Sequence, residues 1–76
     1  MKANPVHPKK LLMSKWTAVN PLSREKHFMV VQVIEPKIEG APIEKIVIEA
    51  VISRRQKTIH WRPLTNGSEW QRGWIC

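Results

Sequence analysis

The stretch Ile59-His60-Trp61-Arg62-Pro63-Leu64-Thr65-Asn66-Gly67-Ser68-Glu69-Trp70-Gln71-Arg72-Gly73-Trp74 contains three of the four tryptophans of the chain. Each tryptophan can remove roughly 150–250 Å² of surface from water when it packs. In a chain of 76 residues this is a large share of the burial available for folding. We therefore expect this stretch to begin as a strand and to end as an aromatic cap over the core, with Trp61 mostly buried.

Alternation of apolar and polar side chains predicts four strands. The clearest is 44–53, in which Ile46, Ile48 and Ile52 face the same way. Because short loops join consecutive strands, we expect them to pair as antiparallel neighbours. The predicted fold class is mainly all-β: a four-stranded antiparallel meander, twisted or partly closed into a small barrel, with a short C-terminal helical turn that carries Trp70. The four predicted strands are 15–19, 27–34, 44–53 and 57–62.

The predicted core is formed by the inward positions of these strands. Strand 27–34 is apolar on both faces, which predicts a central strand that is covered on both sides or shares one side with another subunit. Strand 15–19 should lie at an edge of the sheet or end at Asn20-Pro21, because proline cannot donate a hydrogen bond to a strand ladder. The residues predicted to form the core are Trp16, Phe28, Val30, Ile46, Ile48, Ile52, Ile59 and Trp61.

The chain is expected to consist of a tail and one domain. Residues 1–10 hold two prolines and three lysines without apolar periodicity, which predicts a mobile basic tail. Residues 11–76 are predicted to form a single small β domain, because the chain is too short for a second core. On this reading, deletion of the first eight residues leaves the melting temperature nearly unchanged.

The formal net charge of +7 is concentrated at both ends of the chain. Residues 1–15 carry four lysines and no acidic residue, and residues 54–76 carry five cationic residues and one glutamate. Such a distribution favours polyanions such as nucleic acid, or an anionic membrane surface. The alternative is a basic surface that only keeps the protein in solution.

Catalysis and metal binding are not expected from the residues present. His27 and His60 are candidate general bases, but neither has a serine or cysteine in a recognisable nucleophile arrangement. A single cysteine, Cys76, makes no disulfide within the chain, and with three dispersed histidines it does not match a structural zinc site. We therefore expect no enzyme activity, no cofactor and no metal. The lone thiol and the absence of a secretory signal or a long apolar run predict a cytoplasmic protein without a membrane span.

The tryptophans divide into two pairs. Trp16 and Trp61 occupy apolar positions of predicted strands and are expected in the core. Trp70 and Trp74 are four residues apart, so a helical turn would place them on one side, either as a cap over the core or as a platform for stacking. The nearest cations in sequence, Arg62 and Arg72, would then either flank a stacked base or cover the rings themselves. A basic turn over residues 54–57 is predicted to extend along the next strand as a stripe that includes His60 and Arg62.

Several segments resemble a family of small tryptophan-rich proteins from cyanobacteria and some proteobacteria, whose function is unknown. These segments are Lys-Lys-Leu-Leu-Met-Ser-Lys-Trp-Thr-Ala-Val (9–19), Glu-Lys-His-Phe (25–28), Ile-Glu-Ala-Val-Ile-Ser (48–53) and Trp-Arg-Pro-Leu…Trp…Gly-Trp (61–74). The resemblance implies a bacterial, cytoplasmic protein in which the tryptophans are the hallmark. It implies no activity and no cofactor.

Two functions remain open at this point. The first is a non-enzymatic module for RNA or single-stranded nucleic acid, since strands, aromatic rings and cations are present without a long helix for a major groove. The second is a protein-interaction or self-association module that docks through apolar strand faces and Trp70/Trp74. The position of the exposed tryptophan relative to the Arg54–Arg62 stripe separates them. The candidate nucleic-acid-binding residues are Lys9, Lys10, Lys15, Arg54, Arg55, Lys57, His60, Arg62, Trp70, Arg72 and Trp74.

Overall fold

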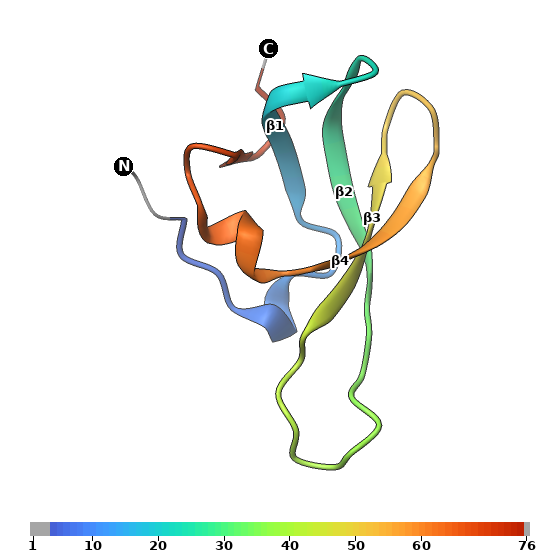
Figure 1. Cartoon of the computed structure of the whole chain (residues 1–76), viewed down its shortest axis with the longest axis vertical. Helices are drawn as coiled ribbons and strands as arrows, with labels where there is room; N and C mark the ends of the chain where they lie inside the picture. The colour runs from blue at the N-terminus through green and yellow to red at the C-terminus, as the bar shows by residue number, and fades with distance from the viewer. Residues whose placement is uncertain (1–3, 76) are drawn as a thin grey trace.

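The computed structural model describes residues 4–75 of the chain, and these form one open, mainly antiparallel β-sheet (Figure 1). Within these residues five strands are hydrogen-bonded in the order β4-β3-β2-β1-β5. Two short 3-10 helices complete the fold. The elements are η1 (Pro8–Lys10), β1 (Lys15–Leu22), β2 (Glu25–Val33), β3 (Lys45–Ala50), β4 (Gln56–His60), η2 (Arg62–Thr65) and β5 (Trp70–Arg72).

The predicted meander of the first four strands is confirmed. Each consecutive pair is antiparallel, and the central pair sets Val30 opposite Ile48 and Phe28 opposite Ala50. A register shift between Val30 and Gln32 marks a β-bulge in β2. Because side chains alternate between the faces of a strand, these paired residues all lie on one side of the sheet, called here the covered face.

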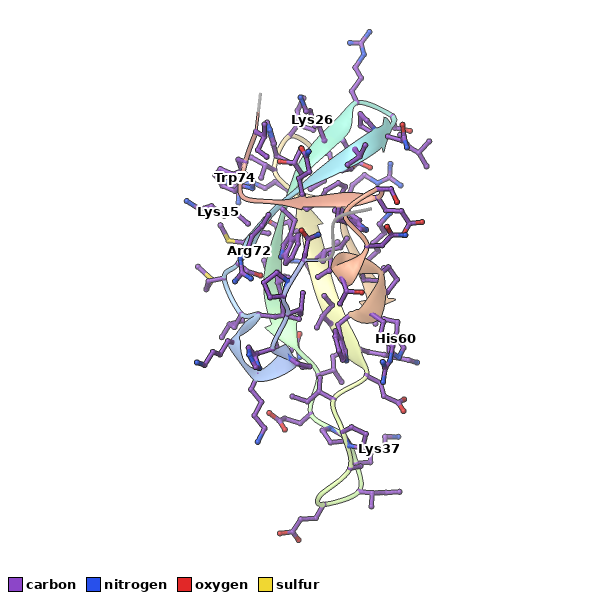
Figure 2. The ribbon with its side chains drawn as sticks, turned by 90° about the vertical axis from the view of Figure 1, so that its left-hand side faces the viewer. Lys15, Lys26, Lys37, His60, Arg72 and Trp74 are labelled. Carbon is purple, nitrogen blue, oxygen red and sulfur yellow. The ribbon has the colours of Figure 1, made fainter. Side chains whose placement is uncertain are left out.

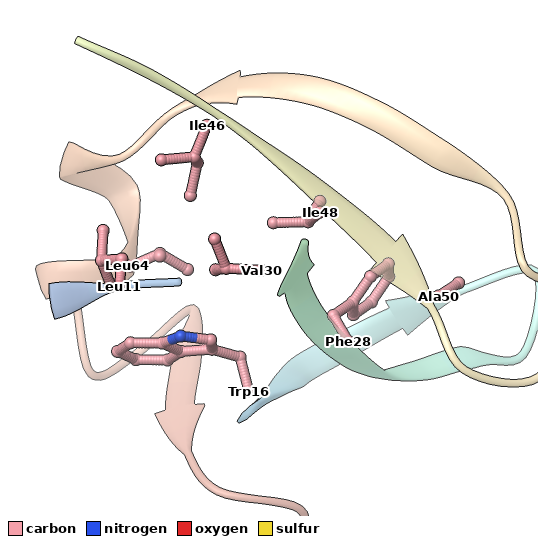
Figure 3. Packing of buried hydrophobic residues seen from close by; sticks show 8 residues of the cluster. All are labelled: Leu11, Trp16, Phe28, Val30, Ile46, Ile48, Ala50 and Leu64. Carbon is pink, nitrogen blue, oxygen red and sulfur yellow. The ribbon is translucent and has the colours of Figure 1, made fainter. Parts of the chain in front are cut away.

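The core lies between the covered face and the segments that cross it. The ring of Trp16 packs in this layer together with Leu11, which precedes β1, and Leu64 from η2 (Figure 3). Val6 and Trp70 pack against the cluster from its edge. The buried apolar residues are Leu11, Trp16, Phe28, Val30, Ile46, Ile48, Ala50 and Leu64.

Three parts of the predicted fold class are wrong. The sheet contains a fifth strand and is not closed into a barrel. Trp70 lies in that strand, β5, where it pairs with Ala18 of β1 instead of starting a helical turn. The helical turn falls earlier, at η2, where Pro63 occupies one of the first two positions. Proline is favoured there because the first turn of a helix has no internal partner for its N–H groups.

The strand ends also differ from the prediction. β1 continues through Pro21 to Leu22 with an irregular register and pairs with both β2 and β5, so it neither ends at the proline nor lies at an edge of the sheet. β3 ends at Ala50, whose carbonyl accepts a hydrogen bond from Arg54 N at 2.8 Å and so closes a turn. Ile52 lies in that turn with 71% of its surface exposed, so its assignment to the core is wrong.

The other predicted core residues are in the core or at its margin. Five of them belong to the buried cluster, namely Trp16, Phe28, Val30, Ile46 and Ile48. Ile59 and Trp61 are only partly buried and pack against that cluster. Trp61 is therefore less deeply buried than expected. Trp16 is the tryptophan that is fully buried in the core.

Part of the predicted basic tail makes contacts with the domain. Asn4 donates from its side-chain amide to the carbonyls of Leu64 at 2.8 Å and Trp70 at 2.9 Å. Its backbone N–H donates to the Thr65 carbonyl at 2.9 Å, and Val6 packs against the core. Residues 1–3 of that prediction lie outside the described residues. Mobility of the tail stays a prediction, but the described part of it is bound along η2 and β5.

The helices of residues 4–75 are short. None of the helices among them is both long enough and apolar enough to cross a bilayer.

Candidate functional site

The face of the sheet opposite the core carries an exposed tryptophan. The strand register places Lys15 and Thr17 of β1 on this outer face, together with His27 and Met29 of β2. Trp74, two residues beyond β5, lies against this region with 41% of its surface exposed. We call the group Lys15, Thr17, His27 and Trp74 the Trp74 patch.

Backbone contacts on both sides of Trp74 fix its position. The Thr17 hydroxyl donates to the Gly73 carbonyl at 2.6 Å and accepts from the Ile75 N–H at 2.9 Å. Gly73 itself donates to the Lys15 carbonyl at 2.7 Å. Its φ of +86° turns the chain from the strand onto the outer face, and only glycine adopts this conformation without a steric penalty.

The indole ring of Trp74 is held as firmly as its backbone. Its Nε1–H donates to the carbonyl of Phe28 at 2.9 Å, although the ring belongs to the last residues of the chain. The Lys15 ammonium lies 4.6 Å from the ring centroid, within the range of a cation–π contact. The His27 ring lies 6.2 Å away at 44°, and its Nε2 contacts the Ile75 carbonyl at 2.9 Å. An aromatic face and a cation are thus adjacent at the surface (Figure 2).

The other tryptophans are structural. Trp16 is fully buried and donates from Nε1 to the Ser14 hydroxyl at 2.8 Å. Trp61 donates to the Ile43 carbonyl at 2.7 Å. Trp70 meets the Phe28 ring edge-on at 5.3 Å. The expectation that Trp70 and Trp74 share one side is therefore wrong, because β5 turns the first toward the core and Gly73 turns the second away.

Two of the predicted binding arginines cover aromatic rings. The Arg62 guanidinium lies 5.2 Å from the Trp61 ring, and that of Arg72 lies 5.6 Å from the Trp16 ring. Arg72 also donates to the Pro5 carbonyl at 3.0 Å. Both residues therefore shield their rings from water. The alternative role considered for them was to flank a stacked base.

The basic turn between β3 and β4 is partly neutralised. Arg54 lies 3.5 Å from the Glu49 carboxylate, and Arg55 lies 4.0 Å from that of Glu25. All four side chains keep contact with solvent, so these pairs contribute little stability. They nevertheless reduce the positive potential that a phosphate group would meet at the turn.

The predicted basic stripe is not continuous. Lys57 pairs with Ile48 and therefore lies on the covered face, where its ammonium is 5.8 Å from the Phe28 ring. His60 lies three residues later on the opposite face, where its Nδ1 accepts from the Arg62 N–H at 3.2 Å. The period of two in this strand carried that information, since positions 57 and 60 differ by an odd number.

The two remaining predicted cations, Lys9 and Lys10, lie on η1 and are exposed. Lys9 also lines an open groove of about 1300 Å³ between η1 and the loop that joins β2 to β3. Lysine and glutamate side chains both line this groove, including Lys37 and Glu35, so its charge does not favour one ligand class. Among the described residues, no three His, Cys, Asp or Glu side chains are grouped so as to hold a metal ion.

The sequence did not predict that Thr17 holds the backbone around Trp74, or that Lys15 lies beside the Trp74 ring. Thr17 is only 2% exposed, although Lys15 and Val19, its neighbours on the same face of β1, are both exposed. The only signal in the sequence is Gly73 directly before Trp74, which marks a change of direction after the last strand.

Comparison with known families agrees with the tryptophan pattern. No curated protein and no solved structure gives a significant match to this chain. The sequence model of one family, described as "Tryptophan-rich protein (DUF2389)", matches residues 14–75. This match includes all four tryptophans and all five strands, and the chain belongs to this tryptophan-rich family of unknown function.

Proposed function

We propose that the protein is a non-enzymatic module that binds RNA or another single-stranded nucleic acid at the Trp74 patch. The observation that carries this proposal is the fixed, exposed indole of Trp74 beside the Lys15 ammonium. A base stacked on an aromatic ring contributes roughly 1–3 kcal/mol to binding, and this contribution does not depend on the base. The patch lies on an open sheet face, which admits an extended strand of nucleotides.

The charge of the chain supports the same ligand class. Among residues 4–75, Arg54 and Arg55 form ion pairs, whereas Lys9, Lys10 and Lys15 have no carboxylate within 4.0 Å. Phosphate contacts require cations but no particular base sequence. We therefore expect the protein to bind single strands through charge, with little sequence preference.

A salt titration of the wild-type protein is the first test. Protein purified after nuclease treatment in high salt is titrated against a fluorescent oligouridine, and binding is followed by anisotropy. If about five phosphates are neutralised, the logarithm of affinity falls with the logarithm of salt at a slope of roughly −3 to −4. Absence of binding at low salt would contradict the proposal.

Charge reversal at two lysines locates the site. Lys15→Glu removes the cation beside Trp74, so we expect it to weaken binding by about tenfold or more. Lys37→Glu makes the same charge change in the loop at the far end of the molecule (Figure 2) and should have a clearly smaller effect. Equal losses in the two variants would show that attraction is diffuse and that the Trp74 patch is not the site.

Charge reversal at the basic turn, residues 54–57, does not separate binding from folding. Arg55→Glu would place a second carboxylate beside Glu25, so that folding and binding would change together. The test therefore uses Lys15, whose side chain is exposed and has no carboxylate partner in the part of the chain that the structure describes.

A protein-interaction or assembly role is the second candidate, and the exposed Trp74 and Ile75 favour it. Trp70 is not available for such docking, because its ring packs on Phe28. Light scattering against protein concentration tests self-association. Growth of the mass with concentration, in a protein that does not bind oligonucleotide, would favour this role.

A further inference from the structure

Two turns of the sheet meet at one end of the molecule. We call two segments the hairpin end: residues 22–24, which are the last residue of β1 and the turn to β2, and residues 51–55, between β3 and β4 (Figure 1). Glu25 joins the turns, because its carboxylate accepts a hydrogen bond from the Ser53 hydroxyl and lies 4.0 Å from Arg55. Val51 N–H also donates to the His27 carbonyl at 2.9 Å. The two turns are therefore held as one surface.

This surface exposes aliphatic side chains. Leu22 is 79% exposed, Ile52 is 71% exposed and Val51 is 42% exposed. A single exposed apolar residue needs no explanation, but three on two adjoining turns form a local apolar tip. Its residues lie on two hairpin turns that protrude at one end of the molecule (Figure 1).

Arginine occupies positions in these turns that suit glycine. Ser23 and Arg24 form a two-residue turn with φ values of +53° and +64°, and Arg54 has a φ of +62°. Side chains with a Cβ are strained in this region, and such turns usually carry Asn-Gly or a similar pair. Strained residues tend to persist where the side chain has a function. The hairpin end carries an arginine at each of its two turns despite this strain.

Cations surround the apolar tip. Arg24, Lys26, Arg54 and Arg55 lie in or near the turns, and among residues 4–75 the carboxylates that pair with this end belong to Glu25 and Glu49. Four positive and two negative side chains leave a net charge of +2 (4 − 2) around the exposed aliphatic groups. An anionic partner that also accepts aliphatic side chains matches both properties.

We propose that the hairpin end binds the surface of an anionic lipid bilayer. Leu22 and Ile52 enter the boundary between headgroups and acyl chains, and Arg24, which forms no ion pair among residues 4–75, contacts lipid phosphates. Interfacial binding of this kind adds burial of apolar area to attraction by anionic lipids. A bilayer is fluid, so it receives a protruding tip without a complementary pocket.

Other occupants match the hairpin end less well. A nucleic-acid strand offers phosphates but no apolar phase for leucine and isoleucine, and the tip carries no aromatic ring for stacking. A symmetric contact with a second copy would bring the same cations face to face, because a two-fold interface places each patch against itself. The proposal is independent of nucleic-acid binding at Trp74, which uses another surface.

Vesicle flotation tests the proposal with nuclease-treated protein. We expect binding to phosphatidylcholine vesicles that contain phosphatidylglycerol and much weaker binding to phosphatidylcholine alone. Leu22→Ser/Ile52→Ser should weaken binding by about tenfold or more, because the inserted aliphatic groups are lost. The matched control Ile38→Ser removes an equally exposed isoleucine, 74% exposed, from the β2–β3 loop at the other end and should leave binding unchanged.

A second variant separates membrane contact from folding. Arg24→Gly relieves the backbone strain at a φ of +64° and breaks no ion pair among residues 4–75, so we expect the melting temperature to rise while vesicle binding falls about fivefold. A variant that is less stable than wild type, or that keeps full binding, would overturn the role given to Arg24.

Three other results would overturn the proposal as a whole. They are failure of the wild type to bind anionic vesicles at low salt, equal binding to neutral vesicles, and full binding by Leu22→Ser/Ile52→Ser. The last result would indicate adsorption by charge alone. Binding of oligonucleotide is measured separately, so either proposal can fail without the other.

Discussion

The two faces of this sheet use the same residue type in opposite ways. On the covered face, Trp16 is fully buried under the N-terminal segment and η2, and its indole N–H is bound inside the protein. On the outer face, Trp74 is equally well fixed by hydrogen bonds but remains 41% exposed. The first arrangement stabilises the fold. The second keeps an aromatic ring rigid at the surface, which lowers the conformational entropy that a binding partner must remove.

The comparison predicts the largest effect for Trp16→Ala. Removal of a fully buried tryptophan typically costs about 3–5 kcal/mol, a large part of the stability of a small domain. We therefore expect this variant to be largely unfolded, with loss of the cooperative denaturation transition in circular dichroism. A cooperative transition close to that of wild type would show that the core does not depend on this ring.

Deletion of residues 1–8 should have the next largest effect. The deletion removes the three hydrogen bonds of Asn4, each worth roughly 0.5–1.5 kcal/mol, and the packing of Val6. We expect a loss of about 2–4 kcal/mol in urea denaturation, whereas the sequence suggested almost none. Lys10→Ala, an exposed change on η1, is the control and should stay within about 0.5 kcal/mol of wild type. An unchanged denaturation midpoint after the deletion would show that this segment is free in solution.

Thr17→Val tests how the outer face is fixed. Valine keeps the shape but leaves the Ile75 N–H and the Gly73 carbonyl without their partner, at a cost of about 1–3 kcal/mol. Release of Trp74 should also increase its quenching by acrylamide. Thr58→Val on β4, which is exposed, is the matched control. If quenching stays the same in Thr17→Val, the hydroxyl does not hold the tryptophan in place.

The sequence allowed the central strands and their pairing to be predicted, because β2 and β3 show local alternation. It did not predict the end of β3, since Val51 and Ile52 continue the apolar pattern into a turn that Arg54 closes. It also missed β5, whose three residues pair with β1 more than fifty positions earlier. Pairing over such a separation leaves no mark in a short segment.

The candidate site was predicted only in part, because the pairing of distant segments leaves no local pattern in the sequence. Trp74 and Lys15 were both named as candidates, but only the pairing of distant strands brings them together. Arg54 and Arg55 were named as candidate binding residues, and the carboxylates that pair with them come from β3 and β2. Local patterns thus identified the residues, whereas their neighbours depended on the fold.

The affinity of Trp74→Ala for a fluorescent oligouridine tests the central claim most directly, namely that Trp74 serves binding and not folding. Because the ring is 41% exposed but its N–H is bonded to the Phe28 carbonyl, we expect the variant to fold with a free energy of unfolding lower by about 1–3 kcal/mol, a smaller loss than in Trp16→Ala. Affinity should fall by about tenfold or more, in keeping with the loss of one stacked base. Full affinity in a folded variant, or a variant that does not fold, would contradict the account.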